Sequence, residues 1–203
     1  MSPPKLALNA SIEQHSFGRP IFEKVLEPGK NWNENLLYDH ASQFLDEIIK
    51  KGTPMKINQD IFVWVCIINH KVMLDMDIMY EEALEFYEMI LQSIKLMVSP
   101  EWLHNSSRIQ DTINFRKGRI QKYKAILKLQ QEELSKENLH DLAAAYYDAF
   151  MVAGGLSVPK AIHNALAVIY SSNSPKDQDL EINEENLLAF VLEVLRFYPL
   201  VAG

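Results

Sequence analysis

The chain has 203 residues, and 48% of them are hydrophobic, which is enough for one substantial core. Its 27 acidic and 20 basic residues give a formal charge of −7. This balance argues against nucleic acid as a partner, because phosphate binding needs concentrated Lys and Arg. The one basic stretch, residues 116–128, also carries apolar residues at helical spacing and is interpreted as a solvated helix face.

No apolar stretch long enough for a signal peptide stands at the N-terminus. The longest apolar region, residues 143–170, is interrupted by charged and polar side chains and therefore does not read as a transmembrane segment. We expect a chain from a reducing compartment, in the cytoplasm or peripheral to a membrane. The single cysteine, Cys66, excludes an internal disulfide, and its apolar surroundings in the sequence predict a small core residue.

Apolar residues recur at steps of three and four along most of the chain, as in amphipathic helices, and no segment alternates with a period of two. The predicted fold class is therefore mainly α. We expect residues 1–11 to form a flexible N-terminal segment and residues 12–203 to form a single domain. Capping residues and breaks at Pro and Gly divide the pattern into helices. The predicted helices span residues 12–26, 33–50, 57–74, 78–98, 108–134, 136–172 and 183–198.

The sixth of these predicted helices is unusual, because residues 136–172 would form a helix about 55 Å long. In its middle stand Gly154 and Gly155, followed by Pro159, and these residues cost a helix several kcal/mol relative to alanine. One interpretation is a groove in which a flat ligand approaches the backbone. The other is a helix that ends at the glycines and restarts near Ser157. The residues alone leave both interpretations open.

The last predicted helix carries Glu193 and Arg196, whose spacing places them on one helix face. Their neighbours in the sequence are apolar, so we expect the pair to be mostly buried and to face the long helix. Burying charges costs several kcal/mol unless the geometry is well satisfied. The alternative is the ordinary ion pairing of a surface helix.

Together, these two motifs resemble the I and K helices of the cytochrome P450 family of haem-thiolate enzymes. The first motif is Ala153-Gly-Gly-x-Ser157 within an interrupted long helix, and the second is Glu193-x-x-Arg196 followed by Pro199. The resemblance implies a P450-like helical domain over residues 12–203, but an incomplete one, because the family's haem-ligand Cys loop is not in this sequence.

Two upstream segments extend the resemblance. His15-Ser-Phe-Gly-Arg19 is similar to the family's C-helix His-x-x-x-Arg, and residues 41–57 look like its D helix leading into the buried E helix. By resemblance, His15 and Arg19 would bind the haem propionates.

The resemblance also implies roles for the two helical motifs. Ala153 and Gly154 would contact the haem, while Gly154, Gly155 and Ser157 would line the catalytic face. Glu193 and Arg196 would form a structural ion pair together with a further Arg downstream.

The sequence departs from the oxygen-activating members of the family. These members carry an acid followed by Thr after the glycine and so deliver protons to oxygen, whereas this chain has Leu156 and Ser157. The apolar Leu156 is closer to the hydroperoxide-rearranging branch, the allene oxide synthases. That branch, however, has an Asn where this chain has Met151. Monooxygenation and hydroperoxide rearrangement therefore both remain open.

The family's iron ligand is a Cys in a Phe-x-x-Gly loop, which this sequence lacks, and Cys66 lies in a helical segment that cannot replace it. We therefore expect a partial copy of a larger enzyme, or a remnant, that binds no haem by itself. The six His residues are scattered, which predicts no metal site. The expected partners are a redox protein and an apolar small molecule. The small molecule is suggested by the apolar residues around the glycines, for which simple core packing is the alternative, namely Met151, Val152, Leu156 and Val158. The alternative function is a cofactor-free helical interaction module.

Overall fold

The computed structural model describes residues 34–52, 54–98, 100, 106–130, 135–148, 154–170, 183 and 185–198. Within these ranges every regular element is helical, which confirms the predicted mainly α class. The helices are α2 (Glu34–Lys51), α3 (Ile57–Leu74), α4 (Tyr80–Val98), α5 (Ser106–Gln130), α6 (Lys136–Ala145), α7 (Gly155–Tyr170) and α8 (Leu187–Phe197). The predicted N-terminal segment and the predicted helix over residues 12–26 lie outside the described residues.

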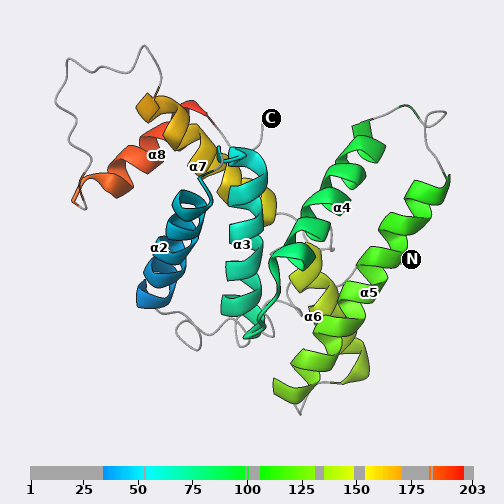
Figure 1. Ribbon diagram of the computed structural model, residues 1–203. Coiled ribbons are helices and arrows are strands. Elements are labelled where there is room, and N and C mark those ends of the chain that lie inside the picture. Colours follow the sequence, from blue (N-terminus) through cyan, green and yellow to red (C-terminus); the bar gives the residue numbers. More distant parts are fainter. Residues whose placement is uncertain are drawn as a thin grey trace.

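Helix α3 is the centre of the fold. It contacts α2, α4, α5 and α7, and Figure 1 shows it between α2 on one side and the α4 and α5 pair on the other. Because its sequence is apolar on nearly every face, it buries residues all around its axis. The buried residues of α3 are Ile61, Phe62, Val63, Val65, Cys66, Ile68, His70 and Leu74.

Helices α4 and α5 are held together by charges over a layer of aromatic rings. The guanidinium of Arg119 on α5 donates to Glu82 and to Glu85 on α4, the latter at 2.8 Å. The same guanidinium lies 4.6 Å from the ring centroid of Phe86 and 5.0 Å from that of Phe115. Arg119 is only 11% exposed, so these interactions are formed in a partly desolvated place.

The long helix predicted over residues 136–172 is not one regular helix. Helix α6 ends at Ala145, residues 146–148 and Gly154 are π-helical, and α7 begins at Gly155. One of these π-helical residues is Gly154, and the cost of glycine to a regular helix favours an irregularity there. The predicted capping residue is confirmed at the start of α6, where the Asn138 N–H donates to Ser135 Oγ at 3.2 Å.

Helix α8 begins at Leu187 rather than at the predicted Asn183. The Asn183 side chain instead closes a turn before the helix, because its oxygen accepts from the N–H groups of Glu185 and Asn186. Helix α8 packs on α7, and Asn164 of α7 donates to the carbonyl oxygen of Tyr198 at 3.2 Å. Among the described residues, no helix combines the length and apolar character needed to cross a bilayer.

Candidate functional site

Gly155 lies where α7 crosses α3, and its missing side chain is used for helix packing. A β-carbon at this position would lie 3.3 Å from Cε2 of Phe62, closer than an ordinary van der Waals contact. The missing side chain of this glycine therefore allows a close approach to the aromatic ring of Phe62 on α3. The catalytic role that the resemblance implies for Gly155 stays a prediction. Gly154 is π-helical and Gly155 begins α7, so the described helix includes both glycines and does not restart near Ser157.

The other residues of the glycine motif are only partly described. Gly154 is π-helical, and Ser157 is half-buried in the first turn of α7. Leu156 and Val158 are 36% and 44% exposed, so an apolar surface does flank the motif. Ala153 and Met151 lie outside the described residues, as do His15 and Arg19. A ligand contact at this motif therefore remains a prediction.

Glu193 and Arg196 form the predicted ion pair, but the pair lies at the surface and not in the core. The guanidinium donates from Nε and from a terminal nitrogen to the two carboxylate oxygens, at 2.8 and 2.7 Å. The side chains are 55% and 61% exposed, so the expectation that the pair is buried is wrong. Val194 is the buried residue of α8, and the pair lies outside the surface that packs on α7.

The exposure of this ion pair limits its contribution to the stability of the fold. Hydrogen bonding from Arg196 lowers the pKa of the Glu193 carboxyl, while the same bonds raise the pKa of Arg196. Water screens such a pair, and exposed ion pairs contribute little to stability. Apolar residues surround the pair in the sequence, but several of them are exposed as well, namely Leu187, Leu188, Leu192 and Phe197.

A buried polar chain crosses the core between α3 and α5. His70 is fully buried, and its Nδ1 lies 2.7 Å from the carbonyl oxygen of Cys66, while its Nε2 lies 2.7 Å from the hydroxyl of Tyr123. A carbonyl can only accept, so Nδ1 carries the proton and donates. In the neutral ring, Nε2 then accepts from the Tyr123 hydroxyl. The ring edges of Phe86 and Tyr123 complete the enclosure of the imidazole.

Burial keeps the groups of this polar chain in their neutral forms. Burial lowers the pKa of His70 to about 4, and the nearby Arg119 adds to that effect. Burial also raises the pKa of Cys66 to about 12 and raises that of Tyr123. At neutral pH the imidazole is therefore neutral and the thiol is protonated, which leaves no nucleophile and no metal ligand of the thiolate kind. The arrangement is a satisfied buried network that joins two helices.

Sequence reasoning singled out neither His70 nor Tyr123. The signal available was a lone histidine four residues after Cys66 within an apolar run, a spacing that lets its ring reach the backbone of its own helix. Tyr123 gave no comparable signal, because the contact joins residues far apart in the sequence.

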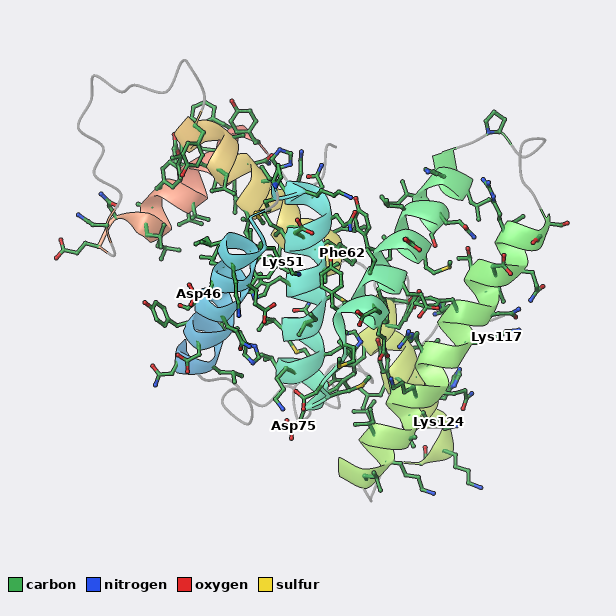
Figure 2. The ribbon with its side chains drawn as sticks, viewed as in Figure 1. Asp46, Lys51, Phe62, Asp75, Lys117 and Lys124 are labelled. Atoms are coloured by element: carbon green, nitrogen blue, oxygen red, sulfur yellow. The ribbon has the colours of Figure 1, made fainter. Side chains whose placement is uncertain are left out.

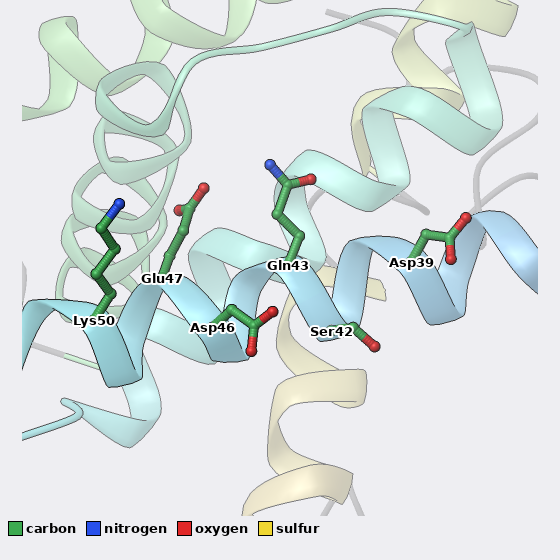
Figure 3. A pocket seen from close by; sticks show the side chains of 6 residues that line it. All are labelled: Asp39, Ser42, Gln43, Asp46, Glu47 and Lys50. Atoms are coloured by element: carbon green, nitrogen blue, oxygen red, sulfur yellow. The ribbon is translucent and has the colours of Figure 1, made fainter.

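Ligand sites made of charged side chains are sparse in the part of the chain that the structure describes. No group of three His, Cys, Asp or Glu residues there could hold a metal ion. Figure 3 shows a shallow depression along α2, to which a single helix contributes every side chain. Such a polar stripe is a solvated helix face that encloses nothing. Its residues are Asp39, Ser42, Gln43, Asp46, Glu47 and Lys50.

Comparison with known proteins identifies no relatives. No protein-family model matches the chain, and no significantly similar protein was found among curated proteins or solved structures.

Proposed function

We propose that this chain is part of a P450-type haem-thiolate monooxygenase that acts on an apolar substrate. The observation that carries the proposal is the pairing of the two motif-bearing helices. The glycine motif opens α7, the Glu-x-x-Arg motif lies on α8, and the two helices pack against each other with Asn164 bonded to the Tyr198 carbonyl. The two helices that carry the motifs are thus neighbours in space, although the Glu193–Arg196 pair lies outside the surface between them.

The described residues do not by themselves fit a haem. Cys66 is 1% exposed and its thiol is protonated, so it cannot supply the thiolate that haem-thiolate chemistry needs. The space left by the missing side chain at Gly155 is taken by Phe62 of α3. The proposal therefore requires an iron ligand from residues beyond this sequence, and no reaction step is assigned here to the haem.

The proposal extends to partners and location. A monooxygenase needs electrons from a redox partner protein, whereas the hydroperoxide-rearranging variant needs none. Leu156 at the position of the acid and Ser157 at that of Thr keep this second variant within the proposal. The partly exposed Leu156 and Val158 support an apolar substrate beside α7. We place the enzyme in the cytoplasm or at a membrane surface.

The test is the absorption spectrum of the reduced, carbon monoxide-bound protein after incubation with haem. The 203 residues alone should give no thiolate-type Soret band, because Cys66 is buried. A chain extended by the sequence encoded downstream, if it contains the Phe-x-x-Gly-x-x-x-Cys segment, should give that band. Such a band from the 203 residues alone, or none from an extended chain that carries the segment, would refute the proposal.

A cofactor-free helical interaction module is the second candidate. The observation that favours it is the exposed apolar surface of α8, where Leu188, Leu192 and Phe197 are 70%, 58% and 62% exposed next to the exposed ion pair. Leu188 and Leu192 are four residues apart and share one face of the helix, and exposed apolar residues that lie together mark interaction sites. This candidate predicts that neither the 203 residues nor an extended chain binds haem, and that Leu192→Ser weakens association with a partner without altering the helical circular dichroism.

A further inference from the structure

Three large apolar side chains face solvent along α2. Tyr38, Leu45 and Ile49 are 74%, 53% and 75% exposed. At about 100° per residue, their positions fall within about 40° of one another, so they form one stripe along the helix, which we call the α2 stripe. Helix α2 lies at an edge of the molecule (Figure 1) and packs on α3 through another side, where Phe44 stacks on Trp64. The α2 stripe is therefore an apolar surface of the kind that marks an interaction site.

Two opposite charges lie beside this stripe, on the same side of it. Asp39 and Lys50 are each about a quarter of a turn from the stripe, and Figure 3 shows them toward opposite ends of the helix. They are 11 residues apart, or about 16 Å along the axis, so they cannot pair with each other within one chain. Neither forms an ion pair with any other described residue.

The spacing of these residues makes the surface complementary to a second copy of itself. Tyr38 and Ile49 are also 11 residues apart. If two copies of α2 pack antiparallel about a two-fold axis, Tyr38 of one faces Ile49 of the other, and Leu45 lies near the axis. The same arrangement places Asp39 opposite Lys50 of the second copy, and this happens twice. The midpoints of the two kinds of pair differ by one residue, about 1.5 Å, which a lysine side chain spans.

We propose that α2 is the interface of an antiparallel dimer of this chain, with the two α2 stripes packed together and two Asp39–Lys50 ion pairs between the copies. An acid at one end of the helix and a base at the other favour this occupant, because a parallel copy would place like charges side by side. The proposal depends neither on the glycine motif of α7 nor on the proposed enzyme activity.

One feature of the surface opposes association. Asp46 lies on the same side as Asp39 and Lys50 but near the middle of the helix, so it approaches the same residue of the second copy. Two carboxylates near the axis repel each other. A single pair of helices also buries a small area, and small interfaces give weak association. We therefore expect a dimer that dissociates in the micromolar range.

Sedimentation velocity of the 203-residue protein over a range of concentrations tests the proposal, and monomer should convert to dimer as the concentration rises. Leu45→Gln and Ile49→Gln should each weaken the dimer at least tenfold, because every change removes two apolar side chains from the interface. Both positions are exposed, so the helical circular dichroism should not change. Leu129→Gln on α5 is the matched control, since Leu129 is 83% exposed and lies outside α2, and it should leave association unchanged.

Exchange of the charges identifies the pairing. Asp39→Lys and Lys50→Asp should each weaken the dimer about tenfold, because either change places like charges opposite each other twice. The formal charge is −7, so Asp39→Lys would strengthen association if net repulsion alone controlled it. The double variant Asp39→Lys with Lys50→Asp should restore the original affinity within about threefold. Asp46→Asn should tighten the dimer.

Lys117→Glu on α5 is the control for charge, since Figure 2 places Lys117 across the molecule from Asp46, and it should not affect the dimer. A protein that stays monomeric at all concentrations would overturn the proposal. So would a dimer that survives Leu45→Gln but is lost in Leu192→Ser, which would assign the interface to α8. Failure of the double variant to regain affinity, or weaker association in Asp46→Asn, would also contradict the antiparallel arrangement.

Discussion

The Nε2 atom of His70 lies 2.7 Å from the hydroxyl oxygen of Tyr123, and this contact joins α3 to α5 across 53 residues of sequence. Both side chains are fully buried. The hydrogen bond therefore forms where water cannot replace it, and the loss of either partner leaves the other unsatisfied.

Replacing Tyr123 with Phe should destabilise the fold. The change keeps the ring but removes the donor to His70 Nε2, so a buried acceptor loses its only recorded partner on that side. Leaving such a group unsatisfied costs about 1 to 3 kcal/mol. Urea denaturation measures the change, and Tyr38→Phe on α2 is the control, because Tyr38 is 74% exposed. Equal stability of the two variants would show that the hydrogen bond contributes nothing.

Stability should fall as the pH drops from about 6.5 to about 4. Burial lowers the pKa of His70 in the folded protein from 6.5 to about 4, so between these values the unfolded chain binds a proton that the folded chain does not. Stability therefore rises with pH across this window and is fully present above it. The effect is of the order of 3 kcal/mol, from 1.36 kcal/mol per pKa unit.

Chemical denaturation at a series of pH values measures this dependence. His70→Gln should flatten the slope between pH 4 and 6.5. His140→Gln, a change at an exposed position of α6, should leave the slope as it is. A slope that persists unchanged in His70→Gln would mean that other groups cause it.

The positions of the helices could be predicted from the sequence more accurately than the burial of their residues. The bounds of α3 agree with the prediction from residue 57 to residue 74, because an apolar run between clear breaks determines a helix locally. The π-helical geometry at Gly154 agrees with the irregularity predicted there, because a glycine weakens a helix through its own backbone, whereas Pro159 lies inside α7 without ending it. Capping by Ser135 is local in the same sense.

Burial was harder to predict, because it depends on what packs against an element. Val194 and Leu192 are both apolar residues of α8, yet one is buried and the other is 58% exposed. Because apolar neighbours in the sequence do not determine burial, the prediction that Glu193 and Arg196 are buried was wrong. The prediction that they form an ion pair is confirmed. The contact of Gly155 with Phe62 could not be foreseen either, because no pattern in the sequence relates α7 to α3.

Two glycines within helices should respond to alanine with different results. Gly118 lies on the exposed side of α5, with no atom within 4 Å of an added β-carbon, so Gly118→Ala should stabilise the protein by about 0.5 to 1 kcal/mol through helix propensity. At Gly155 the added carbon meets Phe62, which is 2% exposed and cannot move away freely. Gly155→Ala should lack the gain.

The larger Gly155→Val should destabilise the protein by about 1 to 3 kcal/mol through overpacking. Thermal and urea unfolding of the three glycine variants give the comparison. A gain in Gly155→Ala equal to that in Gly118→Ala would show that Phe62 does not press on α7. The assignment of Gly155 to helix packing would then fail.

Two arginines that each donate to carboxylates from two nitrogens should differ sharply in their effect on stability. Arg119 is 11% exposed, is bonded to Glu82 and Glu85 and covers two aromatic rings, so Arg119→Met should cost about 1.5 to 3 kcal/mol, the usual range for hydrogen bonds to charged groups. Methionine keeps the apolar stem but leaves Glu82 with Lys122 as its remaining cation. Urea denaturation at neutral pH measures the loss.

Arg196→Met is the matched comparison, because the Arg196 pair with Glu193 has good bidentate geometry but is open to water. Screening by solvent should leave the stability of the 203 residues without measurable change. Because this pair contributes little to the free energy of unfolding, high salt should have the same effect on the stability of the original protein and of Arg196→Met. A loss in Arg196→Met as large as that in Arg119→Met would show that Glu193 and Arg196 are buried in solution, and would restore the structural role that the resemblance to the haem enzymes assigns to them.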